Sequence, residues 1–248
     1  VGGAGGFAEG MRNAQAAGCD WIWLMDDDAA PAPDSLHILL ERGLDPSVVA
    51  LAPQVVDNRG RPSLYHRGAI DLSDPGLHRP LVPSMLEKQE SEVDFISFVG
   101  LLVRSSAVQR VGYPEDRFFV QHDDVEFSIR LGKIGHMLLI PAAKILHVEQ
   151  RPRGSTTRRF LWFSRQRPSG DSFWIDVLTF RNELWIVLAH GPTVGRWWLA
   201  WRLIARQMLL CILFDTSKSR RLRAYGRAAM DALSDRLDND WLRSLREN

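Results

Sequence analysis

The chain has 248 residues, of which 45% are hydrophobic and 25% charged, with a formal net charge of +1. These values predict one large globular domain, or one domain with an appendage, and give no overall electrostatic basis for nucleic-acid binding. Cys19 and Cys211 lie far apart and lack metal-ligand spacing, which indicates a reducing compartment and no disulfide framework. The sequence begins at Val1 inside a glycine-rich segment, so we expect a fragment whose amino-terminal part is missing.

Hydrophobic periodicity and turn residues predict an α/β region followed by a helical one. Residues 1–6 are expected to form a flexible glycine-rich turn, which is followed by a helix that Gly18 closes. That helix is expected at 7–17, and a buried strand at 21–25, a short helix at 34–43 and a strand at 48–56 follow it. After a polar stretch to 92, a buried strand is expected within 93–103, where Gly100 marks a bulge or close approach. The last expected elements are a helix at 123–134, strands at 137–140 and 144–147, and helices at 173–190 and 194–214.

Three consecutive acids follow the apolar run at 21–25. In an extended segment, Asp26 and Asp28 would point to one side and Asp27 to the other. Two carboxylates on one side repel each other unless a cation lies between them or one is protonated. A Mg²⁺ or Mn²⁺ ion that bridges these acids to a diphosphate is therefore one interpretation. The alternative is a solvated acidic turn that caps the next helix.

A second acidic cluster, Asp123, Asp124 and Glu126, opens the helix expected at 123–134. Acids in a first helical turn are favoured by the helix dipole, so capping is one explanation. The other is a general base that takes a proton from an acceptor hydroxyl. His147 ends a predicted strand. A lone histidine is more often structural, and a metal role gains weight only because two acidic clusters need a cation nearby.

Basic residues gather in the second half of the chain. Residues 151–170 carry six arginines and no acid, and residues 196–227 carry eight Lys or Arg against the single acid Asp215. Such surfaces suit phosphates or anionic lipid headgroups. The segment 151–170 is either a basic loop that closes over a diphosphate or a solvated linker. The Trp- and Arg-containing helix at 194–214 is either interfacial on a membrane or packed on the catalytic domain.

Four motifs in this order resemble family 2 inverting glycosyltransferases of the GT-A fold, closest to the bacterial galactofuranosyl- and rhamnosyltransferase branch. They are Gly2-Gly3-Ala4-Gly5-Gly6-Phe7, Trp23-Leu24-Met25-Asp26-Asp27-Asp28, His122-Asp123-Asp124-Val125-Glu126-Phe127 and Leu146-His147. The resemblance covers roughly residues 1–150. In addition, Thr179-Phe180-Arg181-Asn182 is similar to a Tyr-Arg-Asn element of that branch. The family's first strand and its base-reading Asp-Asn segment would precede Val1.

The resemblance implies a role for each matching residue. Asp26, Asp28 and His147 would hold a Mg²⁺ or Mn²⁺ ion, and Asp124 would be the catalytic base. Donor binding would fall to Gly2, Gly3, Gly5, Gly6, Asp26 and Asp27, and support of the acceptor or base to His122, Asp123 and Glu126. The implied organisation is an incomplete GT-A domain at 1–165 and a helical region at 166–248, for which membrane association is one interpretation.

The expected activity is metal-dependent, inverting transfer of a sugar from a nucleotide-diphospho-sugar donor to a glycan or polyprenyl-linked glycolipid acceptor. UDP-galactofuranose is the first choice of donor and dTDP-rhamnose the second, and the expected location is the cytoplasmic face of the bacterial plasma membrane. Two rival interpretations remain open. One is a metal-dependent nucleotidyltransferase, and the other is a non-catalytic, membrane-associated scaffold of the same fold.

Overall fold

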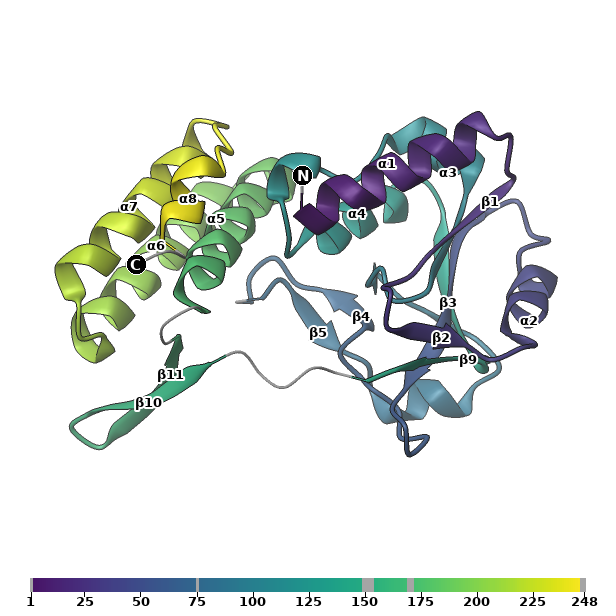
Figure 1. The fold of residues 1–248 in the computed structure, drawn as a ribbon, viewed down its shortest axis with the longest axis horizontal. Coiled ribbons are helices and arrows are strands. Elements are labelled where there is room, and N and C mark those ends of the chain that lie inside the picture. Colours follow the sequence, from purple (N-terminus) through teal and green to yellow (C-terminus); the bar gives the residue numbers. More distant parts are fainter. Residues whose placement is uncertain (1, 75, 149–153, 169–171, 246–248) are drawn as a thin grey trace. The chain divides into compact units, whose positions relative to one another are not determined.

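The computed structural model describes residues 2–74, 76–148, 154–168 and 172–245 (Figure 1). The chain divides into two compact units. Unit 1 comprises residues 1–116 and 123–150, and unit 2 comprises residues 117–122 and 151–248. The predicted domain boundary at 165/166 falls inside strand β11 (Phe163–Pro168).

A mixed six-stranded sheet lies at the centre of the described part of unit 1 (Figure 1). Its strands are β1 (Trp21–Leu24), β8 (Leu101–Arg104), β3 (Val48–Val56), β9 (His136–His147) and β2 (Ala29–Pro31) in spatial order, with β6 (Ser91–Glu92) also paired with β9. Only the β3–β9 pair is parallel among the pairings described; β1–β8, β3–β8, β2–β9 and β6–β9 are antiparallel. The predicted α/β class is confirmed.

Helices cover both faces of this sheet, because successive side chains of a strand point to opposite sides. On one face, Ile22 and Leu24 join a core with Met11, Val108 and Phe127. These last three come from α1 (Gly2–Ala16), α3 (Ser105–Val111) and α4 (Asp123–Gly132). On the other face, Trp21 and Trp23 pack with Leu39 of α2 (Ser35–Arg42). The sheet is therefore buried on both sides, which leaves its loops to carry polar chemistry.

A second, three-stranded sheet occupies much of the stretch that the sequence suggested was only polar. It contains β5 (His78–Pro80), β4 (Arg67–Ile70) and β7 (Phe95–Ile96), with the short 3₁₀ helix η1 (Pro83–Glu87) after β5. The apolar segment 93–103 thus contributes two strands, β7 and β8, to two different sheets. Gly100 lies between them with φ +87°, and an added Cβ would stand 3.0 Å from Cγ of Pro53. The expected close approach at Gly100 is confirmed.

The predicted glycine-rich turn is wrong, since Gly2, Gly3, Gly5 and Gly6 lie in the first turns of α1. Glycine is a poor helix former, but Ala4 and Ala8 are fully buried, and this packing outweighs the low propensity. No loop at these glycines cradles a phosphate in this conformation. The helix ends as expected, with Gly18 at φ +77° donating its N–H to the carbonyl of Gln15.

The strands predicted at 137–140 and 144–147 form the single strand β9. Pro141 has no N–H to donate, yet it does not interrupt the strand. The register against β3 shifts between the pairs Pro53–Ile140 and Gln54–Lys144, so residues 141–143 form an irregularity that accommodates the proline. As a result, β9 continues to His147.

Unit 2 consists of a β-hairpin and helices (Figure 1). Strands β10 (Ser155–Phe160) and β11 form the hairpin, which corrects the expectation of a loop or solvated linker over 151–170 for the residues described. The helices are α5 (Phe173–His190), α6 (Arg196–Phe214), α7 (Lys218–Leu233) and α8 (Asp240–Ser244), and the short 3₁₀ helix η2 (Asp116–Phe118) begins at the end of the first segment of unit 1. The helices predicted at 173–190 and 194–214 are confirmed within two residues.

Candidate functional site

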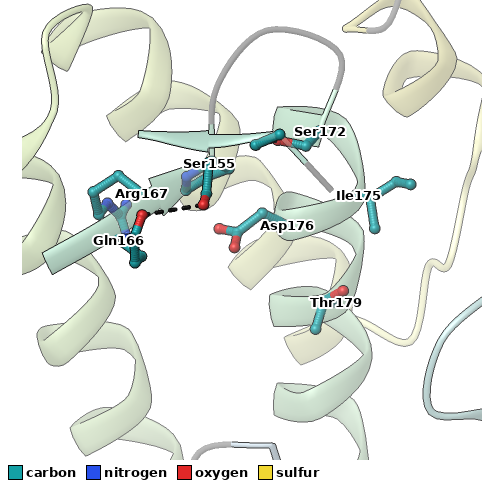
Figure 2. A pocket seen from close by; sticks show the side chains of 9 residues that line it. Ser155, Gln166, Arg167, Ser172, Ile175, Asp176 and Thr179 are labelled. Atoms are coloured by element: carbon teal, nitrogen blue, oxygen red, sulfur yellow. Dashed lines mark hydrogen bonds between the residues drawn. The ribbon is translucent and has the colours of Figure 1, made fainter. Parts of the chain in front are cut away.

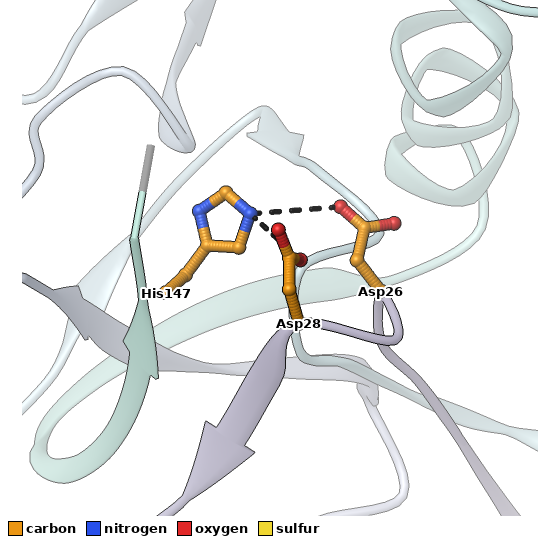
Figure 3. Close-up of side chains that lie close together, drawn as sticks. All are labelled: Asp26, Asp28 and His147. Atoms are coloured by element: carbon orange, nitrogen blue, oxygen red, sulfur yellow. Dashed lines mark ion pairs between the residues drawn. The ribbon is translucent and has the colours of Figure 1, made fainter. Parts of the chain in front are cut away.

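Asp26, Asp28 and His147 come together at the edge of the central sheet (Figure 3). A turn follows β1 and closes where the N–H of Ala29 donates to the carbonyl of Asp26. The next residues form β2, in which Ala29 lies opposite His147 of β9. Nε2 of His147 is 3.3 Å from Oδ1 of Asp28 and 3.9 Å from Oδ2 of Asp26. The acids converge through this turn and not, as expected, through an extended segment.

This cluster has the donor set of a divalent-cation site. One ligand atom from each of the three residues lies within 4.8 Å of the others. Among the described residues, neither Asp26 nor Asp28 forms a salt bridge with Lys or Arg, and His147 is the one basic side chain beside them. Carboxylate oxygens suit Mg²⁺ and Mn²⁺, and three protein ligands leave coordination positions for phosphate oxygens. The residues therefore fit the predicted ion.

The electrostatics of the cluster follow from its partial burial. Burial raises the pKa of Asp26, the charge of His147 opposes this, and the neighbouring charges of Asp28 and Asp27 add to it. His147 is only 9% exposed, and its Nδ1 has no hydrogen-bond partner among the described residues. Asp27 is exposed and lies outside the cluster. Its predicted donor role stays a prediction.

Asp124 stands in the first turn of α4, where its Oδ1 accepts the N–H of Val125 at 2.8 Å. Its neighbours Asp123 and Glu126 are buried, at 7% and 3% exposure. The Glu126 carboxylate is held by Arg130 at 2.8 and 2.6 Å, and Arg130 also donates to the carbonyl of Tyr113. Arg130, oriented by Glu126, therefore ties the helix that carries Asp124 to the backbone at Tyr113. Acceptor contacts by Asp123 and Glu126 remain predictions.

His66 and Arg67 connect the two acidic groups, and sequence reasoning missed both. The His66 ring meets that of His147 edge-on at 5.2 Å, and its Nδ1 lies 3.0 Å from Oγ of Ser97. Burial, with the nearby charges of Arg67, His147 and His78, lowers the pKa of His66 to about 3, so the ring is neutral at physiological pH.

Arg67 is 1% exposed, and its guanidinium donates to the carbonyls of His66 at 2.7 Å and Val99 at 2.6 Å. Burial lowers its pKa to about 9, and the negative charge of Asp124 acts in the opposite direction. Arg67 is therefore a buried cation whose field acts on Asp124. A single arginine in a polar stretch gave no sequence signal of this burial.

His122 lies in unit 2, at the end of the segment 117–122. Its Nε2 is 3.4 Å from Oε1 of Glu183 on α5. Phe119, Gln121 and His122 all have positive φ, a conformation that costs non-glycine residues roughly 1 kcal/mol each. Nδ2 of Asn182 offsets this cost by donating to the carbonyls of Phe118, Val120 and Gln121. The backbone leading to Asp123 is thus held in one shape within unit 2.

Arg181 supports the same segment. It is fully buried, and it donates to the carbonyls of Arg117 at 3.3 Å and Asp238 at 3.0 Å. The Arg181-Asn182 part of the element noted in the sequence is therefore a clamp on residues 117–122. Whether His122 contacts an acceptor stays a prediction.

Unit 2 also contains a hollow of about 300 Å³ between the hairpin and α5 (Figure 2). None of the predicted site residues lines it. Its lining residues are Gly154, Ser155, Gln166, Arg167, Pro168, Ser172, Ile175, Asp176 and Thr179.

Comparisons with known proteins agree with this geometry. No family model matches the sequence. The chain is 38% identical over 142 residues to galactofuranosyltransferase GlfT1 of Mycolicibacterium smegmatis, which covers 54% of this chain and 46% of the relative. It is 31% identical over 150 residues to N-acetylglucosaminyl-diphospho-decaprenol L-rhamnosyltransferase of Mycobacterium tuberculosis, which covers 54% of this chain and 49% of that protein. The chain is related to galactofuranosyl- and rhamnosyltransferases.

A solved structure extends the similarity in fold. The crystal structure of GalNAc-T7 with UDP, GalNAc and Mn²⁺ matches with a TM-score of 0.52 at 14% identity, covering 95% of this chain and 39% of that one. At this identity, the match concerns the fold, and the predicted GT-A glycosyltransferase fold is confirmed. The chain spans about half the length of the curated relatives it matches.

Proposed function

We propose that the protein is a metal-dependent, inverting glycosyltransferase that uses a nucleotide-diphospho-sugar donor. The observation that carries the proposal is the cluster of Asp26, Asp28 and His147, two carboxylates without a Lys or Arg partner among the described residues and an imidazole, which fit a cation on a diphosphate. Relatives named for galactofuranosyl and rhamnosyl transfer support galactofuranose as the first donor sugar and rhamnose as the second. The acceptor would be a glycan or polyprenyl-linked glycolipid.

Asp26, Asp28 and His147 would hold a Mg²⁺ or Mn²⁺ ion. A bound cation supplies a Lewis acid that offsets the negative charge of the leaving diphosphate. His66 packs edge-on against His147 and so restricts the orientation of that ring. Since His66 is neutral, it adds no positive charge that would compete with a cation.

Asp124 would act as the general base. Its carboxylate would take the proton of an acceptor hydroxyl while the hydroxyl oxygen attacks the anomeric carbon from the face opposite the diphosphate. The anomeric carbon–oxygen bond to the diphosphate breaks in the same step, which inverts the configuration. The positive charge of Arg67 favours the ionised form of Asp124, the form that accepts a proton.

We also propose that the enzyme works at the inner face of the bacterial plasma membrane, where a lipid-linked acceptor would be available. The exposed side chains of Trp197, Trp198 and Trp201 on α6 support this placement. Tryptophan is favoured at the level of lipid headgroups.

The test uses the full-length protein with a panel of nucleotide sugars and Mg²⁺ or Mn²⁺, and compares wild type with Asp124→Asn. We expect metal-dependent release of nucleoside diphosphate and transfer from one donor. The Asn variant should be slower by about 10²–10⁴-fold while still binding donor. Asp20→Asn, a change at an exposed acid, is the matched control and should transfer like wild type.

Two outcomes would contradict the proposal. Release of pyrophosphate from a nucleoside triphosphate, with no sugar transfer, would identify a nucleotidyltransferase. Failure to turn over any donor, with folding and metal binding intact, would identify a non-catalytic scaffold.

A further inference from the structure

The turn of the β10–β11 hairpin presents a continuous apolar tip to solvent. Phe160 pairs with Phe163, so Leu161 and Trp162 form the turn, with Leu161 at φ +53°. Phe160, Leu161, Trp162 and Phe163 are 40%, 69%, 81% and 51% exposed, respectively. Exposure of four adjacent large apolar side chains to water is unfavourable, and their removal from water would stabilise a bound state. An exposed apolar patch of this kind marks a surface that meets a membrane or another molecule.

The strands behind this tip are strongly cationic. Arg158 pairs directly across the hairpin with Arg165, and Arg159 follows it in the sequence. Like charges opposite each other destabilise a hairpin. No acid occurs anywhere in residues 151–170 to offset them. Arg159 and Arg165 are also exposed. A partner that complements this positive surface would therefore be negatively charged.

Helix α6 of the same unit contacts the hairpin and carries exposed tryptophans of its own. The ring of Phe160 contacts that of Phe214 at the end of α6, with centroids 6.3 Å apart. The exposed Trp197, Trp198 and Trp201 lie near the other end, and the rings of Trp198 and Trp201 stack at 5.1 Å. The hairpin and α6 are therefore joined by contact within unit 2.

By length and composition alone, α6 could cross a membrane, and 28% of its most apolar window is buried. However, one side of α6 is packed within unit 2: Ala200, Leu203, Gln207, Cys211 and Phe214 are buried. Their spacing of three and four residues defines a single buried stripe. A helix with one face committed to its own unit and exposed tryptophans elsewhere is suited to lie along the interface.

We propose that the tip of the β10–β11 hairpin inserts into the surface of an anionic lipid bilayer, with Arg158, Arg159 and Arg165 on lipid phosphates and the tryptophans of α6 as a second contact. This deepens the membrane placement proposed above and does not depend on sugar transfer. Basic side chains are attracted to an anionic membrane surface, and insertion of the apolar tip removes its side chains from water.

The test is cosedimentation of the full-length protein with vesicles, either pure phosphatidylcholine or equal parts phosphatidylcholine and phosphatidylglycerol. We expect wild type to bind the anionic vesicles more tightly and to lose binding as salt rises. Leu161→Ser combined with Trp162→Ser should weaken that binding at least about tenfold. Arg159→Gln combined with Arg165→Gln should weaken it by a similar factor.

The matched control is Leu44→Ser combined with Tyr65→Ser. It removes two side chains of unit 1 that are 83% and 67% exposed, and it should bind like wild type. All variants should retain the wild-type unfolding temperature, because the changed side chains are exposed. Unchanged vesicle binding in the tip variant would overturn the proposal. So would a tip variant that alters the oligomeric state while still binding vesicles, since the tip would then contact a second copy of the chain. Vesicle binding without sugar transfer would leave it standing and contradict only the proposed activity.

Discussion

Each unit contains a cluster of charged side chains, and the two clusters differ in how the negative charge of their acids is compensated. In unit 2, Asp215 accepts two hydrogen bonds of 2.8 Å from Arg167, with both side chains almost fully buried, and Arg221 lies 3.4 Å away. In unit 1, Asp26 and Asp28 face each other and a histidine without Lys or Arg among the described residues. Within the described part of the chain, arginines balance the first cluster, and no Lys or Arg balances the second.

The pKa directions follow this difference. Burial acts to raise the pKa of Asp215, but the hydrogen bonds from Arg167 and Cys211 and the arginine charges hold it below the ordinary value. Burial raises the pKa of Asp26, and His147 does not fully oppose it. An acid cluster whose ionised form is already stabilised supports structure. An acid such as Asp26, whose ionised form is disfavoured by burial, is suited to bind a cation that stabilises that form. Four predictions test this contrast.

The largest effect is expected on breaking the balanced cluster. Asp215→Ala would leave Arg167 buried and uncompensated, and we expect it to destabilise the protein by about 3–5 kcal/mol. Chemical denaturation measures this. Glu9→Ala removes an acid from an exposed pair with Arg12 and should cost less than about 1 kcal/mol. Equal losses in the free energy of unfolding for both variants would mean that the buried contact between Asp215 and Arg167 does not stabilise unit 2.

Substitutions in the cluster of Asp26, Asp28 and His147, called here the unbalanced cluster, should change metal affinity and leave the free energy of unfolding nearly unchanged. Asp28→Asn removes one ligand, and we expect affinity for Mn²⁺ to fall at least about 100-fold, because even indirect supporting residues contribute 10- to 100-fold. Asp27→Asn removes the same charge one residue away, outside the cluster, and should change that affinity much less. Titration calorimetry with Mn²⁺ compares them. Similar losses in both variants would show that net charge, not ligation, draws the cation.

The candidate acids could be predicted from the sequence because they lie at the ends of segments with a clear hydrophobic pattern. Five bulky apolar residues precede Asp26, and the helix-starting acids include Asp124. Hydrophobic patterns of this kind predict a strand or a helix without knowledge of its tertiary contacts. The same is true of the strand at 48–56 and the helix at 173–190.

The rest depended on pairing between distant segments. Strand β2 has three residues, too few for a periodic signal, and it forms because β9 supplies its hydrogen-bond partners. That pairing is what brings His147 beside Asp28. Likewise, Arg67 is buried by β7 and the backbone of Val99, some 30 residues away. The charge balance of Asp215 was also hidden, since Arg167 lies 48 residues before it in the sequence.

Arg67 is a third case, a buried cation whose positive charge acts on the carboxylate of Asp124. Arg67→Met should move the acid limb of the pH profile of kcat/KM to higher pH, since a carboxylate ionises less readily without a nearby positive charge. Transfer close to that limb should fall about tenfold, or about 1.4 kcal/mol. Arg67→Lys keeps the charge and should restore part of the shift. A lower rate with an unmoved pH profile in both variants would assign Arg67 to packing alone.

The smallest effect concerns Asp176, which accepts the hydroxyl hydrogen of Tyr225 beside the balanced cluster. Burial raises the pKa of Asp176, although Tyr225 and Arg167 act to lower it. A carboxyl whose folded-state pKa is raised stabilises the fold at low pH and loses that contribution as pH rises through the folded pKa. Asp176→Asn should therefore raise the unfolding temperature at pH 7, within about 4 °C, with a smaller difference near pH 4. A less stable Asn variant at both pH values would show that the arginines of unit 2 need two ionised acids, and that Asp215 alone does not balance them.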